Sequence, residues 1–198
     1  VRIGGFPQAT ARERNGRWTV NADLNWQPEN SLGATLFVTR DQQSVAQRTR
    51  QIGVTGAINP VDADWTHDTH ERTWTVGSTF KWSELAGGRL AMEASALAVR
   101  GSIEELTRAG PAAPASQNPS SPLPDTRYQA LDTRFTATWR MDRATQWKLQ
   151  ASHRRIKQSD WAFANLGAST LPNLVGSLEQ SPDYGVRVLR LSWVRTFR

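Results

Sequence analysis

Two short groups of residues carry side chains that could do chemistry. His67-Asp68-Thr69-His70, preceded by Asp62 and Asp64, combines imidazole and carboxylate groups of the kind that bind divalent metals. Its spacing matches no standard metal site, and a solvated acidic loop is the commoner form of such a segment. We therefore assign no metal ligands to it.

Ser152-His153 invites a hydrolase hypothesis, because a serine and a histidine can form a nucleophile and its base. In a strand, neighbouring side chains point to opposite faces, so these two cannot form such a pair. We predict no catalytic residues and no cofactor-binding residues, and we expect a protein that is not an enzyme.

Composition narrows the class of protein. The chain has no cysteine, which excludes disulfides, thiolate metal sites and covalent haem attachment of its own. The net charge is +6, but the arginines are scattered singly, so we expect no nucleic-acid partner. The mean hydropathy is −0.56, and no run approaches the roughly 18 apolar residues that a spanning helix needs.

Alternation with a period of two organises most of the chain. Trp18, Val20, Ala22, Leu24 and Trp26 share one face of a strand, and polar residues occupy the other face. The same pattern recurs and predicts about seven antiparallel strands, at roughly residues 16–27, 31–41, 70–83, 89–101, 127–140, 145–157 and 184–197. Residues 109–124, rich in Pro, Ala and Ser, indicate a surface loop.

Strand and connection lengths favour a membrane barrel. The predicted strands exceed the usual five or six residues of a soluble sheet and match the 9–11 that cross a bilayer. Short turns follow residues 27, 83 and 140, whereas long segments cover roughly 42–69, 102–126 and 158–183. The pattern predicts an all-β fold, an antiparallel transmembrane up-and-down β-barrel of the bacterial outer membrane, with short turns periplasmic and long loops extracellular. A soluble β-sandwich with one wet face also alternates, but strand length and tryptophan positions count against it.

The nine tryptophans mark the expected membrane interfaces, because indole favours sites that are apolar at one end and wet at the other. The predicted lipid-facing residues, including two aromatic girdles, are Trp18, Trp26, Trp74, Trp82, Trp139, Trp147, Trp193 and Phe197. Their alternating neighbours would face the lumen, and those we assign there are Asn21, Asp23, Lys81, Glu93, Asp132, Arg134, Lys148 and Arg154.

The chain ends suggest that residues 1–198 form a C-terminal segment of one larger barrel domain. Val1-Arg2-Ile3 begins without a methionine or an export signal, and bacterial barrels normally close with an even number of strands. Residues 1–14 could hold part of another strand, although Gly4-Gly5-Phe6-Pro7 argues against it.

The last seventy residues resemble the C-terminus of the MtrB/PioB family of decahaem-associated outer-membrane barrels. The likeness rests on a loop before the final strand, whose matching residues are Asp160, Trp161, Pro172, Asn173, Ser181, Pro182, Asp183 and Tyr184. Leu123-Pro124-Asp125 resembles a segment one hairpin earlier. Arg195 departs from the aromatic residue usual in the family, and Arg198 follows the phenylalanine that normally ends the chain, which could weaken the insertion signal.

The resemblance implies a function. Barrels of that family act as sheaths around a periplasmic multihaem c-type cytochrome, so that electrons cross the outer membrane in extracellular electron transfer. The expected partners are therefore that cytochrome inside the barrel, an extracellular cytochrome as a further candidate, and the lipid bilayer; haem c would be carried by the partner and not by this chain. The alternative is a general diffusion porin or ligand transporter, and only the family-like segment favours the sheath.

Overall fold

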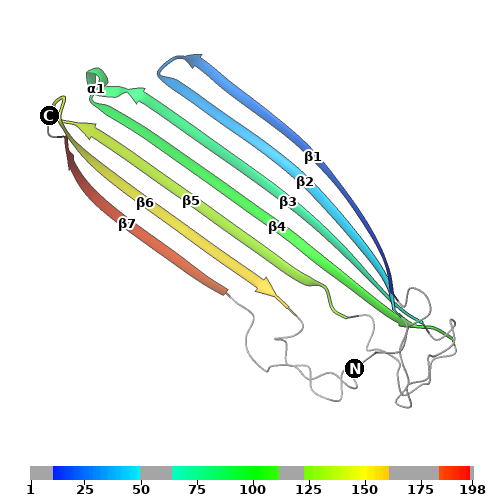
Figure 1. Cartoon of the computed structure of the whole chain (residues 1–198). Helices are drawn as coiled ribbons and strands as arrows, with labels where there is room; N and C mark the ends of the chain where they lie inside the picture. The colour runs from blue at the N-terminus through cyan, green and yellow to red at the C-terminus, as the bar shows by residue number, and fades with distance from the viewer. Residues whose placement is uncertain (1–10, 50–63, 112–122, 161–182, 197–198) are drawn as a thin grey trace, which may run out of the picture.

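The fold is one antiparallel sheet whose strands follow the order of the chain. The computed structural model describes residues 11–49, 64–111, 123–160 and 183–196, and Figure 1 shows the strands running side by side in one curved layer. The strands are β1 (Ala11–Glu29), β2 (Leu32–Thr49), β3 (Trp65–Glu84), β4 (Leu90–Ala109), β5 (Thr126–Arg140), β6 (Thr145–Ser159) and β7 (Asp183–Arg195). Each strand pairs with its neighbours in sequence, in the order β1-β2-β3-β4-β5-β6-β7, as the all-β, up-and-down prediction requires.

The sheet is open in the part of the chain that the structure describes. β1 and β7 form its two edges, and all other strands are paired on both sides. An open edge leaves backbone amide and carbonyl groups without partners, which lipid does not tolerate. The arrangement is that of a piece of barrel wall.

Most strands are longer than the sequence pattern predicted. β1 begins at Ala11, β2 runs on to Thr49, β3 starts at Trp65 and β4 continues to Ala109. These added stretches are mostly polar, with single apolar residues such as Val45, Ile103 and Leu106, and so lack the alternation by which strands were recognised. A strand of 18 to 20 residues rises by about 60 Å at roughly 3.3 Å per residue, nearly twice the length of a tilted crossing of about 9–11 residues.

The short connections gather at one end of the sheet (Figure 1). β3 and β4 are joined there by α1 (Leu85–Gly88), a single tight turn in which Ala86 and both glycines, and Glu84 just before it, have positive φ. Residues 112–122 of the predicted Pro/Ala/Ser-rich loop, Phe197, and all of the family-like loop except Asp160, Asp183 and Tyr184 lie outside the described residues, and Ala109, predicted in that loop, is the last residue of β4. No helix among the described residues is long and apolar enough to cross a membrane.

The β5–β6 turn shows how a short connection is fixed. Asp142 Oδ1 accepts hydrogen bonds from the backbone amides of Ala144 (2.7 Å) and Thr145 (2.8 Å), an Asx-type turn. The amide of Ala144, followed by weaker contributions that include both groups of Thr145, holds the pKa of the Asp142 carboxyl below its ordinary value of 3.8. The turn lies outside the alternating part of the strands.

Candidate functional site: the polar face of the sheet

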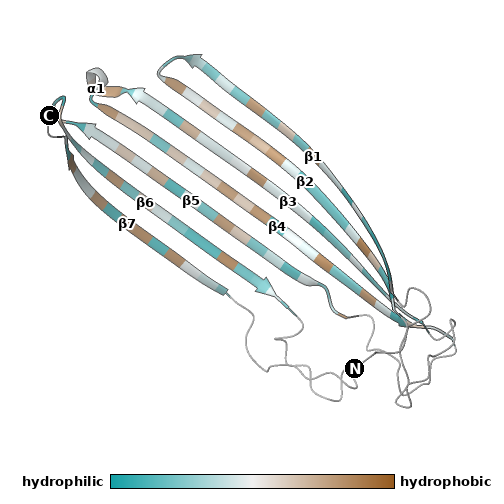
Figure 2. Cartoon of the chain, in the orientation of Figure 1, coloured by the Kyte–Doolittle hydropathy of each residue, from teal (hydrophilic) through white to brown (hydrophobic). Residues whose placement is uncertain are grey.

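The two faces of the sheet differ in chemistry. Directly paired residues in an antiparallel ladder share a face, so the register assigns every strand residue to one side. Trp26 pairs with Ala34, which pairs with Phe80, and that row continues through Ala94, Phe135, Ala151 and Leu189. The alternation is visible along the strands in Figure 2. We call the tryptophan-bearing side the apolar face and the opposite side the polar face.

The register separates the two sets of residues singled out from the sequence. Every predicted girdle residue within the described part of the chain lies on the apolar face: Trp18, Trp26, Trp74, Trp82, Trp139, Trp147 and Trp193. Every predicted lumen residue lies on the polar face: Asn21, Asp23, Lys81, Glu93, Asp132, Arg134, Lys148 and Arg154.

The apolar face leaves large hydrophobic side chains uncovered. Leu24 is 64 % exposed, Leu189 75 % and Leu191 65 %. Among the described residues, no large side chain is fully buried, so this sheet has no hydrophobic core of its own. Exposed apolar surface of this extent indicates a face that meets another apolar phase.

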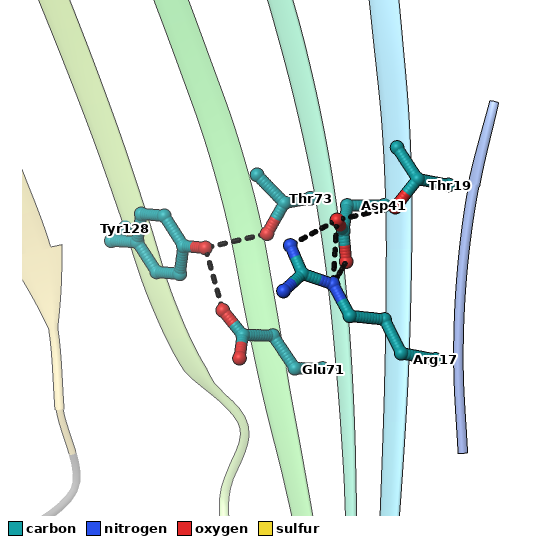
Figure 3. Close-up of polar contacts among 6 residues, drawn as sticks. All are labelled: Arg17, Thr19, Asp41, Glu71, Thr73 and Tyr128. Atoms are coloured by element: carbon teal, nitrogen blue, oxygen red, sulfur yellow. Dashed lines mark hydrogen bonds and ion pairs between the residues drawn. The ribbon is translucent and has the colours of Figure 1, made fainter. Parts of the chain in front are cut away.

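The polar face is held together by hydrogen bonds between strands, and Figure 3 shows two clusters of them, one between β1 and β2 and one between β3 and β5. Arg17 Nη2 lies 2.6 Å from Asp41 Oδ2 and Arg17 Nε lies 3.0 Å from the same oxygen. Thr19 Oγ1 donates to Asp41 Oδ2 at 2.8 Å. One carboxylate on β2 therefore accepts from two side chains of β1.

The second cluster in Figure 3 joins β5 to β3 across the intervening strand β4. The Tyr128 hydroxyl on β5 donates to Glu71 Oε1 at 2.9 Å and lies 2.6 Å from Thr73 Oγ1. Both partners are on β3, so the tyrosine ring lies across β4. It can do so because Gly101 is the β4 residue paired with it, and a Cβ there would overlap the ring.

A second aromatic side chain lies flat in the same way. Phe37 on β2 is paired with Gly77 on β3, where a Cβ would overlap the phenyl ring. Gly33, also on the polar face of β2, would have nothing within 4 Å of an added Cβ. Gly77 and Gly101 therefore provide space for a flat ring, which keeps both rings low on the polar face.

Smaller pairs continue the pattern toward both ends of the sheet. Thr39 Oγ1 donates to Asn21 Oδ1 at 2.7 Å and Thr35 Oγ1 to Asn25 Oδ1 at 2.8 Å, each directly across the β1–β2 ladder. On β5 and β6, Arg154 contacts Asp132 Oδ2 through Nε (2.8 Å) and Nη2 (2.6 Å). Hydrogen-bond donors on one strand are thus paired with acceptors on the neighbouring strand along the polar face.

The two groups with possible chemistry do not form sites. Residues 67–70 lie inside β3 and not in a loop, which corrects the sequence prediction; His67 faces the polar side and its neighbour Asp68 the apolar side. The His67 ring bonds to Thr107 and Thr69, and among the described residues no three His, Asp or Glu side chains gather as metal ligands would. Ser152 and His153 are adjacent in β6 and so point to opposite faces.

Sequence analysis did not single out the residues that form these two clusters. Arg17, Asp41, Glu71, Thr73 and Tyr128 lie on the polar face, inside the predicted strands but near their ends. The signal was present, because the period of two within the predicted strands places all of them on one side.

The comparisons with known proteins agree with this geometry. The model of a family described as "Putative outer membrane beta-barrel porin, MtrB/PioB" matches residues 12–197. No curated protein and no solved structure gives a significant match to the chain.

Proposed function

The chain belongs to the MtrB/PioB family of outer-membrane β-barrel porins, and from that membership we propose that its sheet forms part of the wall of a sheath around a periplasmic multihaem c-type cytochrome. The barrel performs no chemistry itself. It holds the cytochrome so that electrons cross the outer membrane, in either direction, without contact between the haem chain and lipid.

The observation that carries the proposal is that the described sheet has no hydrophobic core and has one apolar and one polar face. The apolar face, with its exposed leucines and tryptophans, suits lipid. The polar face is lined by charges and hydrogen-bonded pairs, which would cost several kcal/mol each in hydrocarbon. Such a face suits a lumen that contains water or another protein.

The shape of the polar face favours a protein occupant. Phe37 and Tyr128 lie over glycines, and the Arg17 and Arg154 guanidiniums are bonded to carboxylates of the wall. Side chains tied down in this way project little into the lumen and leave room for a folded domain. A diffusion porin instead needs a constriction, which would come from segments outside the described residues.

Haem would be carried by the partner. The chain has no cysteine, so it supplies no thioether attachment for haem c, and the His67 ring is engaged by two threonines. We place the short turns in the periplasm and the long segments at the cell surface, the usual arrangement of outer-membrane barrels. The two edges, β1 and β7, would pair with further strands of the same barrel.

Site-specific photo-crosslinking tests the sheath directly. Ser95 and Ala96 are neighbours on β4 that point to the polar and apolar faces respectively, so a photoreactive residue at each position samples the two sides of one wall. In the native host, we expect an adduct that stains for haem peroxidase activity from position 95 and not from position 96. Equal adducts from both positions, or a haem-free barrel that conducts ions in planar bilayers, would contradict the proposal.

Orientation is tested separately on intact cells. Residues 1–198 contain no cysteine. Arg143→Cys in the β5–β6 turn and Arg108→Cys, at the end of β4 far from the short turns, therefore each add one thiol to this chain. A membrane-impermeant maleimide should label the variant at 108 and not the one at 143, with the unmodified protein as background. The reverse pattern would invert the orientation without affecting the sheath.

A further inference from the structure

The apolar face carries a line of arginines at one margin of its hydrophobic band. From β2 to β7, each strand places an arginine on this face on the long-segment side of its apolar residues. We call the arginine of each strand that lies nearest to the apolar residues a member of the arginine belt, and these are Arg40, Arg72, Arg100, Arg127, Arg155 and Arg187. Arg12 and Arg14 on β1, Arg48 on β2 and Arg108 on β4 lie on the same face farther from the apolar residues. All six side chains are exposed.

The register keeps the arginine belt within a few adjacent rows of the ladder. Arg40 and Arg100 both pair with Trp74, and Arg127 lies in the same row as Arg72 because both pair with Ser102. Counting only rows on the apolar face, Arg155 lies one row and Arg187 two rows closer to the short turns than the row of Trp74. The tryptophans at the other margin shift in the same sense, from Trp82 on β3 to the paired Trp139, Trp147 and Trp193 on β5 to β7.

On β3 and β5 the two margins are separated by about the thickness of a membrane. Arg72 and Trp82 are ten positions apart on β3, and Arg127 and Trp139 are twelve apart on β5, which gives about 25–30 Å along the barrel axis for a strand tilted by about 40°. On β7, Arg187 and Trp193 are six positions apart, about 15 Å at the same tilt. The heights on β3 and β5 match the apolar band of an outer-membrane barrel, so on these strands the arginine belt lies where lipid headgroups begin.

The margin at this end combines aromatic rings with cations. Arg40 Cζ lies 5.3 Å from the centroid of Trp18 and 5.1 Å from that of Trp74, so its guanidinium sits between two indoles at the expected interface level. At the opposite margin tryptophans predominate, and Arg195 lies on the apolar face beside Trp193. This difference between the two ends matches a membrane whose leaflets carry different headgroups.

Acidic neighbours leave the arginine belt available to anions. Arg72 lies 3.9 Å from Glu104, Arg127 3.6 Å from Asp125 and Arg155 3.7 Å from Asp183. These exposed pairs are too long for hydrogen bonds and contribute little. For Arg100 and Arg187 no acidic partner is found among the described residues.

We propose that the arginine belt binds the phosphate groups of lipopolysaccharide, the phosphorylated glycolipid of the outer leaflet. Guanidinium is suited to this ligand because its planar donors match phosphate oxygens and it stays charged. A row of cations around the barrel at headgroup height would contact several lipid molecules at once. The inference uses the proposed orientation of the barrel and does not depend on the cytochrome.

Matched double variants of the whole barrel protein test the assignment. R100Q/R187Q removes two charges from the arginine belt, and R134Q/R190Q removes two from the polar face, so the net charge falls equally. Binding to purified lipopolysaccharide should weaken by about tenfold to thirtyfold for R100Q/R187Q and stay unchanged for R134Q/R190Q. Thermal unfolding in detergent without lipopolysaccharide checks that both variants remain folded.

Three comparisons decide whether phosphate on this glycolipid is the ligand. Enzymatically dephosphorylated lipopolysaccharide should bind the unmodified barrel no better than R100Q/R187Q binds the intact glycolipid. Phosphatidylglycerol vesicles of equal charge should bind more weakly. Equal losses in both double variants, equal binding of dephosphorylated glycolipid, or equal binding of phosphatidylglycerol would each overturn the proposal, and inverted thiol labelling at 108 and 143 would show that orientation was the failed premise.

Discussion

Replacing Gly77 by alanine would place a methyl group against the ring of Phe37, the residue paired with it across β2 and β3. Inserting a methyl into an occupied position typically costs about 1–3 kcal/mol through displaced side chains. Alanine itself is better than glycine within a strand by about 0.5–1 kcal/mol. We therefore expect G77A to destabilise the barrel by up to about 2.5 kcal/mol, the difference between the steric cost and the gain.

A double-mutant cycle isolates the contact. In the F37A background the ring is absent, so G77A should become stabilising by about 0.5–1 kcal/mol, and the coupling energy between the two positions should equal the steric cost of about 1–3 kcal/mol. Gly33 supplies the control, because an added Cβ there meets nothing within 4 Å and G33A should not destabilise. The free energy of unfolding would be measured by urea titration of the folded barrel in detergent, following the gel shift between folded and unfolded protein.

The reasoning fails under two outcomes. If G77A is as benign as G33A, the ring does not occupy the space over Gly77. If the cost of G77A persists in the F37A background, it arises from the backbone and not from the Phe37–Gly77 contact.

Three further predictions concern the wall and its turn. S78R should destabilise the barrel by about 2–4 kcal/mol, because Ser78 lies on the apolar face midway between Trp74 and Trp82, whereas T79R on the polar face should cost less than about 1 kcal/mol; equal costs in urea titration would contradict the assignment of faces. The Asp132–Arg154 pair, 60 % exposed at the arginine, should show a coupling energy of only about 0.2–1 kcal/mol in a double-mutant cycle, falling further in high salt. The pKa of Asp142 is lower in the folded protein than its ordinary value of 3.8. The ionised carboxylate should therefore stabilise the turn above the unfolded pKa, and this stabilisation should be lost as pH falls through the folded pKa. A carbon-13 titration of the carboxyl should show the lowered pKa, and D142N should abolish the pH dependence.

The fold was predictable because the apolar band imposes a strict period of two. Trp18 to Trp26, and Trp74 to Trp82, alternate without interruption, and the structure shows a ladder through each. The grouping of residues such as Asp23 and Arg154 on one face follows from the same pattern, because the ladder has no irregularity between them and their paired neighbours.

The ends of the strands were not predictable in the same way. Beyond Arg40, β2 is polar except for Val45 and Ala46, which point to opposite faces. No contrast between the faces therefore marks the strand, although its backbone ladder continues to Thr49. The flat placement of Tyr128 across Gly101 also depends on register, which joins residues 27 positions apart in sequence and cannot be read from either segment alone.

The strictly sequential pairing of β1 to β7 has a consequence for how such a barrel assembles and diversifies. Each strand can dock onto the one made just before it, so chain entropy is lost in small local steps and only the final seam joins distant parts of the chain. Because every hairpin repeats the same two-sided pattern, duplicating or deleting one would change the circumference by a fixed increment while leaving the remaining walls intact. The diameter of such a barrel could thus be changed by the number of hairpins, without redesigning any one of them.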